Sequence, residues 1–173
     1  MIKQARLDES NIIAQKGGVW DSDGEWAEFS NDIDFVGSLA QQAVSTQFKL
    51  WGFLPEETPF FNPDINNDQF DFLWLEERLD VKGSSTAKGF PDVYPNSRFL
   101  RTDHKCEKDI AKIDRYVFVK VNYQDKVAII AGTIRVRKFW AMAKKCEGMS
   151  VTTPSHYILA KNLESFKKFV FAV

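Results

Sequence analysis

Hydrophobic and polar positions divide the chain into a polar beginning and a patterned remainder. Residues 1–33 are mostly polar and contain an acidic stretch at 21–25, which predicts an irregular N-terminal arm or insertion. From residue 34 apolar side chains recur every three to five positions, which predicts one amphipathic helix over 34–50. Its apolar face consists of Phe35, Val36, Leu39, Ala43, Phe48 and Leu50.

Short apolar runs predict four strands in the middle of the chain. The runs at 70–75 and 78–82 flank Glu76 and Glu77 and predict a β-hairpin. The β-rich runs at 114–121 and 127–134 are joined by 122–126 and predict a second hairpin. The intervening segments 55–68 and 83–104 are rich in turn-forming residues, so we expect loops there.

The rest of the pattern predicts a basic helix over 135–145, a short strand at 157–160 and a last short helix at 163–169. This order predicts an α/β fold class in which helices flank a central mixed β-sheet. No repeat, low-complexity tract or linker divides the chain. We therefore expect one domain over 1–173, with a core at 34–145 and a tail at 146–173 that packs on it.

Composition supports a soluble domain and excludes several classes of protein. The chain has 173 residues, of which 44% are hydrophobic, too many for a disordered protein. Cys106 and Cys146 lack a CxxC spacing, so the sequence indicates neither a zinc knuckle nor a redox pair. Neither a signal sequence nor an apolar window of membrane length occurs, so we expect a cytoplasmic protein without a membrane partner. The net charge of -1 argues against a general nucleic-acid coat but allows a local basic patch.

The first predicted hairpin gathers charged side chains on one face. A turn centred on Glu76 and Glu77 places Asp71 opposite Lys82, and Leu73 opposite Asp80. Because paired residues share a face and side chains alternate along a strand, Asp71, Asp80 and Lys82 should emerge together. The other face is apolar and suits a core, with Phe72, Trp74, Leu79 and Val81.

Two carboxylates beside one ammonium group are typical of a Mg²⁺-dependent phosphodiesterase. Hard divalent cations bind one or two carboxylates, with water and substrate phosphate completing the shell. The metal neutralises charge on the phosphate, and the lysine can position the attacking water. We therefore predict that Asp71 and Asp80 hold Mg²⁺ and that Lys82 positions the water. The simplest alternative for Asp80 and Lys82 is an ordinary ion pair on an exposed strand face.

Asp71, followed nine positions later by Asp80-Val81-Lys82, resembles the signature of the PD-(D/E)XK nuclease superfamily. The helix before the hairpin, the two later strands and the basic helix match the order of elements in small members, so the resemblance covers about 34–145. It implies a restriction-endonuclease-like core and a Mg²⁺-dependent DNA endonuclease or related deoxyribonuclease, with Mn²⁺ as a substitute. The backbone carbonyl of Val81 would add a metal ligand.

Two residues depart from the family pattern or compete with it. Many members carry a metal-assisting glutamate on the first helix, where this chain has Gln41, an accessory residue that brings no charge. Asp64, in the literal Pro63-Asp64 pair, is a rival for the first carboxylate, but it lies outside the hairpin. Gln41 keeps a second reading open, that of a catalytically degenerate nucleic-acid-binding or accessory protein on the same fold.

Residues after the signature offer contacts to a nucleic acid. The hydroxyl of Ser84 either shapes the following loop or reaches a phosphate. The basic side chains of the next segment either confer solubility or bind the DNA backbone, and they are Lys88, Arg98, Arg101 and Lys105. DNA is the expected partner, and a homodimer follows only by analogy with nucleases that cut both strands.

Overall fold

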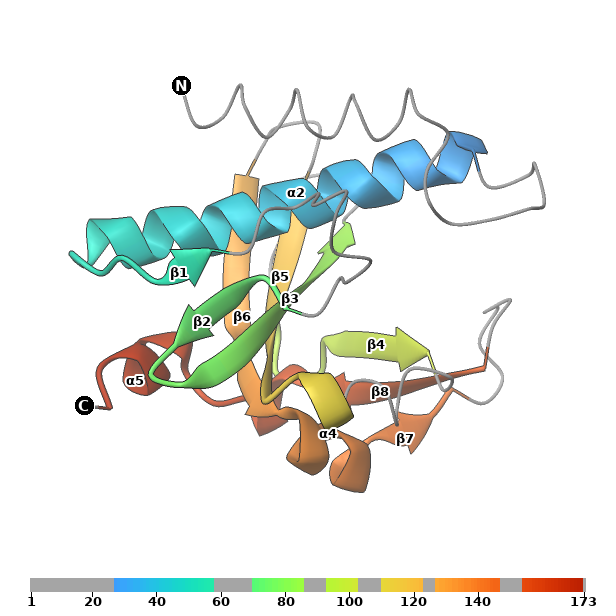
Figure 1. The fold of residues 1–173 in the computed structure, drawn as a ribbon. Coiled ribbons are helices and arrows are strands. Elements are labelled where there is room, and N and C mark those ends of the chain that lie inside the picture. The colour runs from blue at the N-terminus through green and yellow to red at the C-terminus, as the bar shows by residue number, and fades with distance from the viewer. Residues whose placement is uncertain are drawn as a thin grey trace.

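The computed structural model describes residues 27–57, 70–85, 93–102, 110–122, 127–146 and 154–172. These residues form a five-stranded mixed sheet, a three-stranded antiparallel sheet and several helices (Figure 1). The predicted α/β class with a central mixed sheet is therefore confirmed. Within the described ranges no helix is both long enough and apolar enough to span a bilayer.

The five-stranded sheet has the order β1-β2-β3-β5-β6. Its strands are β1 (Glu56–Glu57), β2 (Phe72–Trp74), β3 (Glu77–Ser85), β5 (Arg115–Asn122) and β6 (Val127–Arg135). Only β3 and β5 run parallel, and every other neighbouring pair is antiparallel. Both predicted hairpins are thus confirmed, and the parallel β3–β5 pair joins them into one sheet.

A second sheet lies on the other side of the molecule from the long helix. Its strands are β4 (Arg98–Thr102), β7 (Lys144–Lys145) and β8 (Ser155–Leu159), in the order β4-β8-β7. The expectation of a loop over 83–104 is therefore wrong at 98–102 and at the end of β3, and the loop expected over 55–68 is wrong at Glu56–Glu57, which form β1. The sequence of β4 lacks a clear period-two pattern, and this strand depends on pairing with β8, far along the chain.

The helices differ from the predicted ones mainly at their ends. Helix α2 (Ala27–Leu50) begins seven residues before the predicted start at 34. Once a helix is nucleated, each further polar residue adds a hydrogen bond without needing a buried face, so the apolar pattern understates its length. Helix α4 (Val136–Met142) is shorter than predicted because Lys144 and Lys145 form β7 instead. The chain ends in the 3-10 helix η2 (Ala160–Asn162) and helix α5 (Phe166–Val170).

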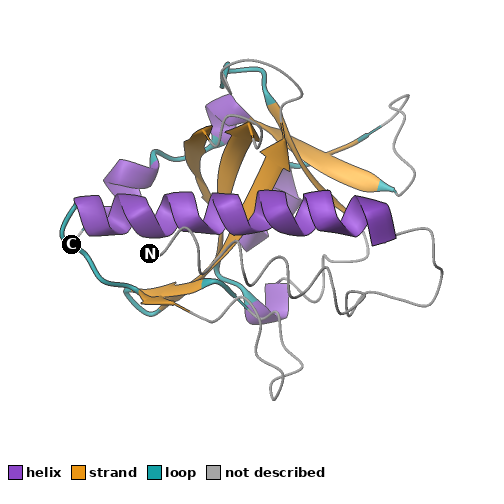
Figure 2. Cartoon of the chain, turned by 90° about the horizontal axis from the view of Figure 1, so that it is seen from above, coloured by secondary structure: helices purple, strands orange, loops and turns teal. Residues whose placement is uncertain are grey.

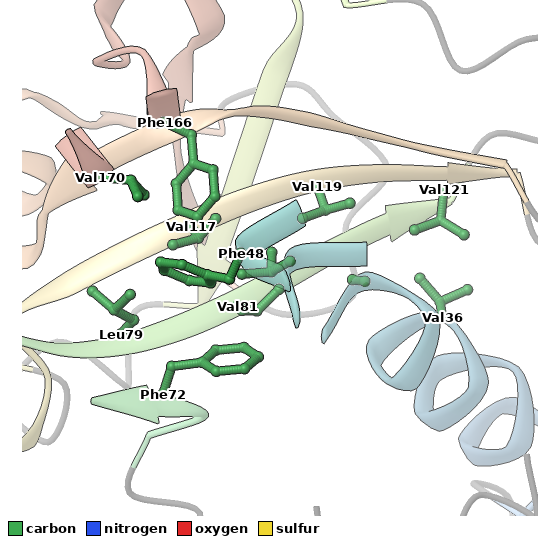
Figure 3. Packing of buried hydrophobic residues seen from close by; sticks show 12 residues of the cluster. Val36, Phe48, Phe72, Leu79, Val81, Val117, Val119, Val121, Phe166 and Val170 are labelled. Atoms are coloured by element: carbon green, nitrogen blue, oxygen red, sulfur yellow. The ribbon is translucent and has the colours of Figure 1, made fainter. Parts of the chain in front are cut away.

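Helix α2 and α5 cover one face of the large sheet (Figures 1 and 2). Buried side chains from both helices meet those of β2, β3 and β5, as Figure 3 shows for Phe48, Phe72, Leu79, Val117 and Phe166. This core confirms the apolar face predicted for the first hairpin. A Cβ added at Gly83 would lie 3.0 Å from Val36 Cγ1, so glycine allows α2 to approach β3 closely.

The opposite face of the large sheet carries a second core. Tyr116 and Phe118 of β5 pack there against Phe139 of α4 and against Phe99 and Ile158 of the small sheet. Along β5 the buried residues therefore alternate between the two cores, as expected for a strand covered on both faces. The large sheet separates α2 on one side from α4 and the small sheet on the other.

Candidate active site

Asp80 and Lys82 lie on the sheet face that points away from α2. Leu79 and Val81 belong to the core beneath α2, so alternation along β3 directs Asp80 and Lys82 to the opposite face. Asp80 is only 7% exposed, and its Oδ1 lies 2.6 Å from Lys82 Nζ. The pair is therefore largely buried, unlike the exposed surface pair that was the simplest alternative reading.

Asp71 reaches the same stretch of β3 through its backbone and its side chain. Its amide donates a 2.8 Å hydrogen bond to the carbonyl of Leu79, and its Oδ2 accepts a 2.6 Å hydrogen bond from the amide of Val81. Val81 is the residue between Asp80 and Lys82. The Asp71 carboxylate is thus held at the strand edge beside both of these residues.

The orientation of Val81 follows from this hydrogen bond. The amide and carbonyl of one strand residue point to the same edge, because hydrogen-bonded strand residues exchange both bonds with one partner. Since the amide of Val81 is directed at Asp71, its carbonyl faces the β2 edge and not β5. The backbone oxygen predicted as a ligand therefore lies on the same edge of β3 as the Asp71 carboxylate.

The predicted register of the first hairpin is wrong by one residue at the turn. Phe72 pairs with Leu79 and Leu73 pairs with Arg78, so the turn consists of Leu75 and Glu76. Glu77, expected in the turn, instead begins β3 and pairs with Trp74. Moving the turn by one residue moves the pairing by two, so that Leu73 faces Arg78 and not Asp80. Because side chains alternate with a period of two, each residue changes its direct partner but keeps its face.

Arg101 approaches the candidate site from the small sheet. Its Nη2 lies 4.0 Å from Asp80 Oδ2, and its guanidinium carbon lies 5.6 Å from the ring centre of Tyr116. Arg101 shares a face of β4 with buried Phe99, and this face is turned toward the large sheet. The sequence named Arg101 as a loop residue, but only the unpredicted pairing of β4 with β8 brings it beside Asp80.

The other predicted contact residues do not all join this cluster. Arg98 lies on the outer face of β4, where its guanidinium carbon is 4.7 Å from the ring centre of Tyr157. Lys88 and Lys105 lie outside the described residues, as does the rival carboxylate Asp64. A phosphate contact by any of these side chains stays a prediction.

Gln41 and Ser84 lie on opposite sides of β3. Gln41 is buried on α2, and α2 packs on the sheet face that Asp80 does not occupy. Ser84 follows Asp80 and Lys82 on their face, and its Oγ is buried without a hydrogen-bond partner among the described residues. Ser84 is thus better placed than Gln41 to meet a group bound near Lys82.

One of the two carboxylate oxygens of Asp80 is incompletely paired within the described residues. Asp80 Oδ2 is buried and accepts no hydrogen bond from a described residue, and Arg101 remains at the outer limit of an ion pair. An incompletely satisfied buried carboxylate oxygen favours a further cation or donor. Within the described ranges no group of three or more Asp, Glu, His and Cys side chains gathers as a metal cage. Any metal here would depend on Asp71, Asp80, backbone oxygen, water and substrate.

An ion pair between Arg78 and Asp114 fastens the start of β3 to the start of β5. Arg78 Nε and Nη2 lie 2.8 and 3.1 Å from the two Asp114 oxygens, and the Arg78 amide also donates to Asp114 at 2.9 Å. The side-chain hydrogen bond from Arg78 holds the pKa of Asp114 below its ordinary value. Arg78, the ion-pair partner of Asp114, lies two residues before Asp80 on β3.

A second ion-pair network contacts Glu77, the residue of β3 next to Arg78. Arg115 Nε lies 2.6 Å from Glu77, and its Nη1 lies 2.7 Å from Glu164 in the C-terminal segment. The hydrogen bond from Arg115 lowers the pKa of Glu164. These contacts tie β3, β5 and the C-terminal segment together, so both ion-pair networks hold β3 at its start, two and three residues before Asp80.

Comparisons of the chain with protein-family models, with curated proteins and with solved structures give no match. The functional proposal below therefore depends on the geometry around β3.

Proposed function

We propose that the chain is a Mg²⁺-dependent DNA nuclease with a restriction-endonuclease-like core. In this proposal Asp71, Asp80 and the Val81 carbonyl hold the metal, and Lys82 positions the attacking water. The observation that carries the proposal is the hydrogen bond from the Val81 amide to Asp71. This bond brings the carboxylate of the residue before β2 to the backbone between the acid and the lysine of β3.

The donor set suits a hard cation. Mg²⁺ prefers oxygen ligands and is usually bound by one or two carboxylates, with the rest of its shell supplied by water and phosphate. The buried Asp80 Oδ2 supports the fit, because it lacks a hydrogen-bond partner among the described residues. A bound Mg²⁺ would supply positive charge to the scissile phosphate and acidify an attached water.

Lys82 has the position and the donors to orient a nucleophile. Its Nζ lies 2.6 Å from Asp80 Oδ1, which fixes the ammonium group beside the proposed metal ligands. An ammonium group carries three donors, so two remain for a water and a phosphate oxygen after one has bonded Asp80. Held in this way, Lys82 can orient the water and stabilise the charge that develops on the phosphate.

A basic surface beside the site supports a polyanionic substrate. Arg101 pairs with His156 across β4 and β8, and His156 pairs with Lys145 across β8 and β7. Residues paired in this way share a face, so these three side chains form a row on the side of the small sheet that is turned toward Asp80. Basic side chains in such a row contribute salt-dependent, sequence-independent affinity for a phosphate backbone.

The order of elements also supports the proposed core. Helix α2 precedes the β2–β3 hairpin, and the parallel strand β5 and antiparallel strand β6 follow it before α4. This is the order on which the sequence resemblance rests. It leaves the acid and lysine near the middle of the sheet, on β3.

The proposal is tested by cleavage of plasmid and single-stranded DNA with Mg²⁺, Mn²⁺ or EDTA. Wild-type protein should cleave with either metal and stop in EDTA. Asp80→Asn and Lys82→Met should each lower the cleavage rate by about 100-fold or more, because each removes a group that acts in the transition state. Lys161→Ala, an exposed lysine on η2, is the matched control and should cleave like wild type. Unchanged rates in Asp80→Asn and Lys82→Met would end the proposal.

One observation favours the second candidate, a non-catalytic nucleic-acid-binding protein. Lys82 and Arg101 both lie within ion-pair distance of Asp80, so two cations already compete with a metal for this carboxylate. Salt-sensitive DNA binding by wild type and Asp80→Asn alike, without cleavage under any metal condition, would select this candidate.

A further inference from the structure

Exposed apolar side chains gather at the end of the molecule where α2 finishes. We call this surface the apolar end and define it by Leu50, Leu54, Leu75 and Phe171, which are 74%, 82%, 50% and 48% exposed. They come from the C-terminus of α2 and the segment after it, the β2–β3 turn, and the residue after α5. In Figure 1 these three regions lie at the same end, beside the C-terminus.

Aromatic rings form a continuous base for this surface. The ring of Phe53 lies 5.0 Å from that of Trp74 on β2 and 5.2 Å from that of Phe171. The ring of Trp51 lies 5.4 Å from that of Phe171 on the other side. These ring contacts pack Phe171 against the segment after α2 and pack that segment against β2. The apolar end therefore joins segments that are distant in sequence.

The turn that presents Leu75 has a backbone that disfavours leucine. Leu75 and Glu76 have φ values of 49° and 63°, as in the two-residue turns that select Asn, Asp and Gly. A side chain with a Cβ is strained in this region, and the leucine side chain stays 50% exposed. An exposed apolar residue at a strained position indicates a use other than the folding of the single chain.

Opposite charges flank the apolar end. Glu56 of β1 and Glu76 of the turn are exposed on the hairpin side, and Lys167 and Lys168 are exposed on the α5 side. Phe53 separates the two sides, because its ring contacts β2 in one direction and Phe171 in the other. Figure 2 shows the same division, with the short strand that follows α2 and the helix before the C-terminus on opposite sides of α2.

We propose that the apolar end binds a second copy of this chain about a two-fold axis. A two-fold interface uses the same surface twice, so the surface must complement itself. A two-fold axis through the apolar end, perpendicular to the line that joins its acidic and basic sides, would place the acidic side of one copy against the basic side of the other. The leucines and Phe171 of the two copies would then bury one another between these charges. The inference does not depend on the nuclease proposal, since none of its residues belongs to the candidate active site.

The first test is sedimentation of the full chain over a range of micromolar concentrations. Wild type should form dimers reversibly, and Leu54→Glu should weaken the dimer by about tenfold or more, because it brings a charge into the apolar centre. Leu100→Glu is the matched control, since Leu100 is an exposed leucine on the small sheet, and it should leave the dimer unchanged. Circular dichroism verifies that both variants fold.

The second test uses complementary charge reversal. The double variant Glu56→Lys with Glu76→Lys has two basic sides, and Lys167→Glu with Lys168→Glu has two acidic sides. Each should sediment as a monomer alone, because like charges meet at both sides of its interface. An equimolar mixture should form a heterodimer, because each acidic side then meets a basic one.

Two results would overturn the inference. A wild-type chain that stays monomeric throughout would exclude self-association by this surface, even if the apolar end captured a different protein. Dimerisation that Leu54→Glu leaves intact would place the interface elsewhere. Cleavage of DNA by the monomeric variants would leave the nuclease proposal standing, so the two proposals fail independently.

Discussion

Asp114 has an electrostatic role that a pH titration can isolate. Its pKa lies below the ordinary value because Arg78 donates to its carboxylate, and the folded state therefore favours the ionised form. The stabilisation is present above the pKa of an unfolded aspartate, about 3.9, and is lost as pH falls through the lower folded pKa. The pair is more than one-third exposed, so solvent screening keeps its contribution modest.

We expect Asp114→Asn to lower the free energy of unfolding by about 1 kcal/mol at neutral pH, measured by urea denaturation. The difference from wild type should shrink as the pH approaches the acidic range where Asp114 itself is protonated. Glu76→Gln, at an exposed acid, is the control and should show little difference at either pH. A pH-independent difference for Asp114→Asn would show that its charge is not responsible.

Leu75 allows the strain of the β2–β3 turn to be measured. Leu75→Asn should raise the free energy of unfolding by about 0.5–1 kcal/mol, because asparagine tolerates positive φ better than leucine. Urea denaturation should be done at protein concentrations low enough that the monomer predominates. Leu54→Asn, at an exposed leucine without positive φ, is the control and should change stability little. A destabilised Leu75→Asn would mean that Leu75 already contributes packing within one chain.

The elements differ in how much of them the local sequence determines. Runs of β-forming residues are enough to predict β5 and β6, and period-two alternation predicts the two faces of β3. The turn was misplaced because polarity favoured Glu76 and Glu77, whereas the chain turns through Leu75 against its local preference. Strand β4 was missed because its pairing partner β8 lies far along the chain.

The candidate site is likewise determined partly by the local sequence and partly by tertiary contacts. The sequence alone puts Asp80 and Lys82 on one face of β3, and the two-residue change in pairing leaves that face unchanged. The approach of Arg101 to Asp80 needed the tertiary placement of β4, which no local pattern encodes. The hydrogen bond between Asp71 and Val81 likewise follows from the observed register rather than from spacing.

The junction between β6 and the C-terminal segment depends on Gly132. This residue has φ 145°, and a Cβ there would lie 2.6 Å from the Glu164 carbonyl oxygen. Because backbone atoms cannot yield as a flexible side chain can, Gly132→Ala should lower the free energy of unfolding by about 2–3 kcal/mol. Loss of this junction would also disturb Glu164, which binds Arg115.

Gly37 provides the matched control for Gly132. It lies within α2, and a Cβ there would meet nothing within 4 Å. Gly37→Ala should therefore raise the free energy of unfolding by about 0.5–1 kcal/mol, since alanine favours the helix. Thermal or urea unfolding of both variants should show opposite changes, and equal destabilisation would contradict the described packing around Gly132.

At the scale of the whole molecule, acidic and basic side chains meet around the candidate site. The acids Asp71 and Asp80 lie on the hairpin, and the row formed by Arg101, His156 and Lys145 lies on the small sheet beside them. A net charge of -1 is therefore compatible with a polyanionic substrate, because the local field and not the sum attracts it. The residues that define the apolar end belong to neither surface.

Single-turnover cleavage of plasmid DNA by Asp71→Asn with Mg²⁺ tests the proposed metal site most directly. The amide oxygen of asparagine can still accept the hydrogen bond from Val81, so the hairpin and its register should be retained. The negative charge that the proposed metal needs is lost. We predict normal folding with a cleavage rate lowered by about 100-fold or more relative to wild type. A folded Asp71→Asn that cleaves at the wild-type rate would contradict the account, because Asp71 would then serve only to hold β3.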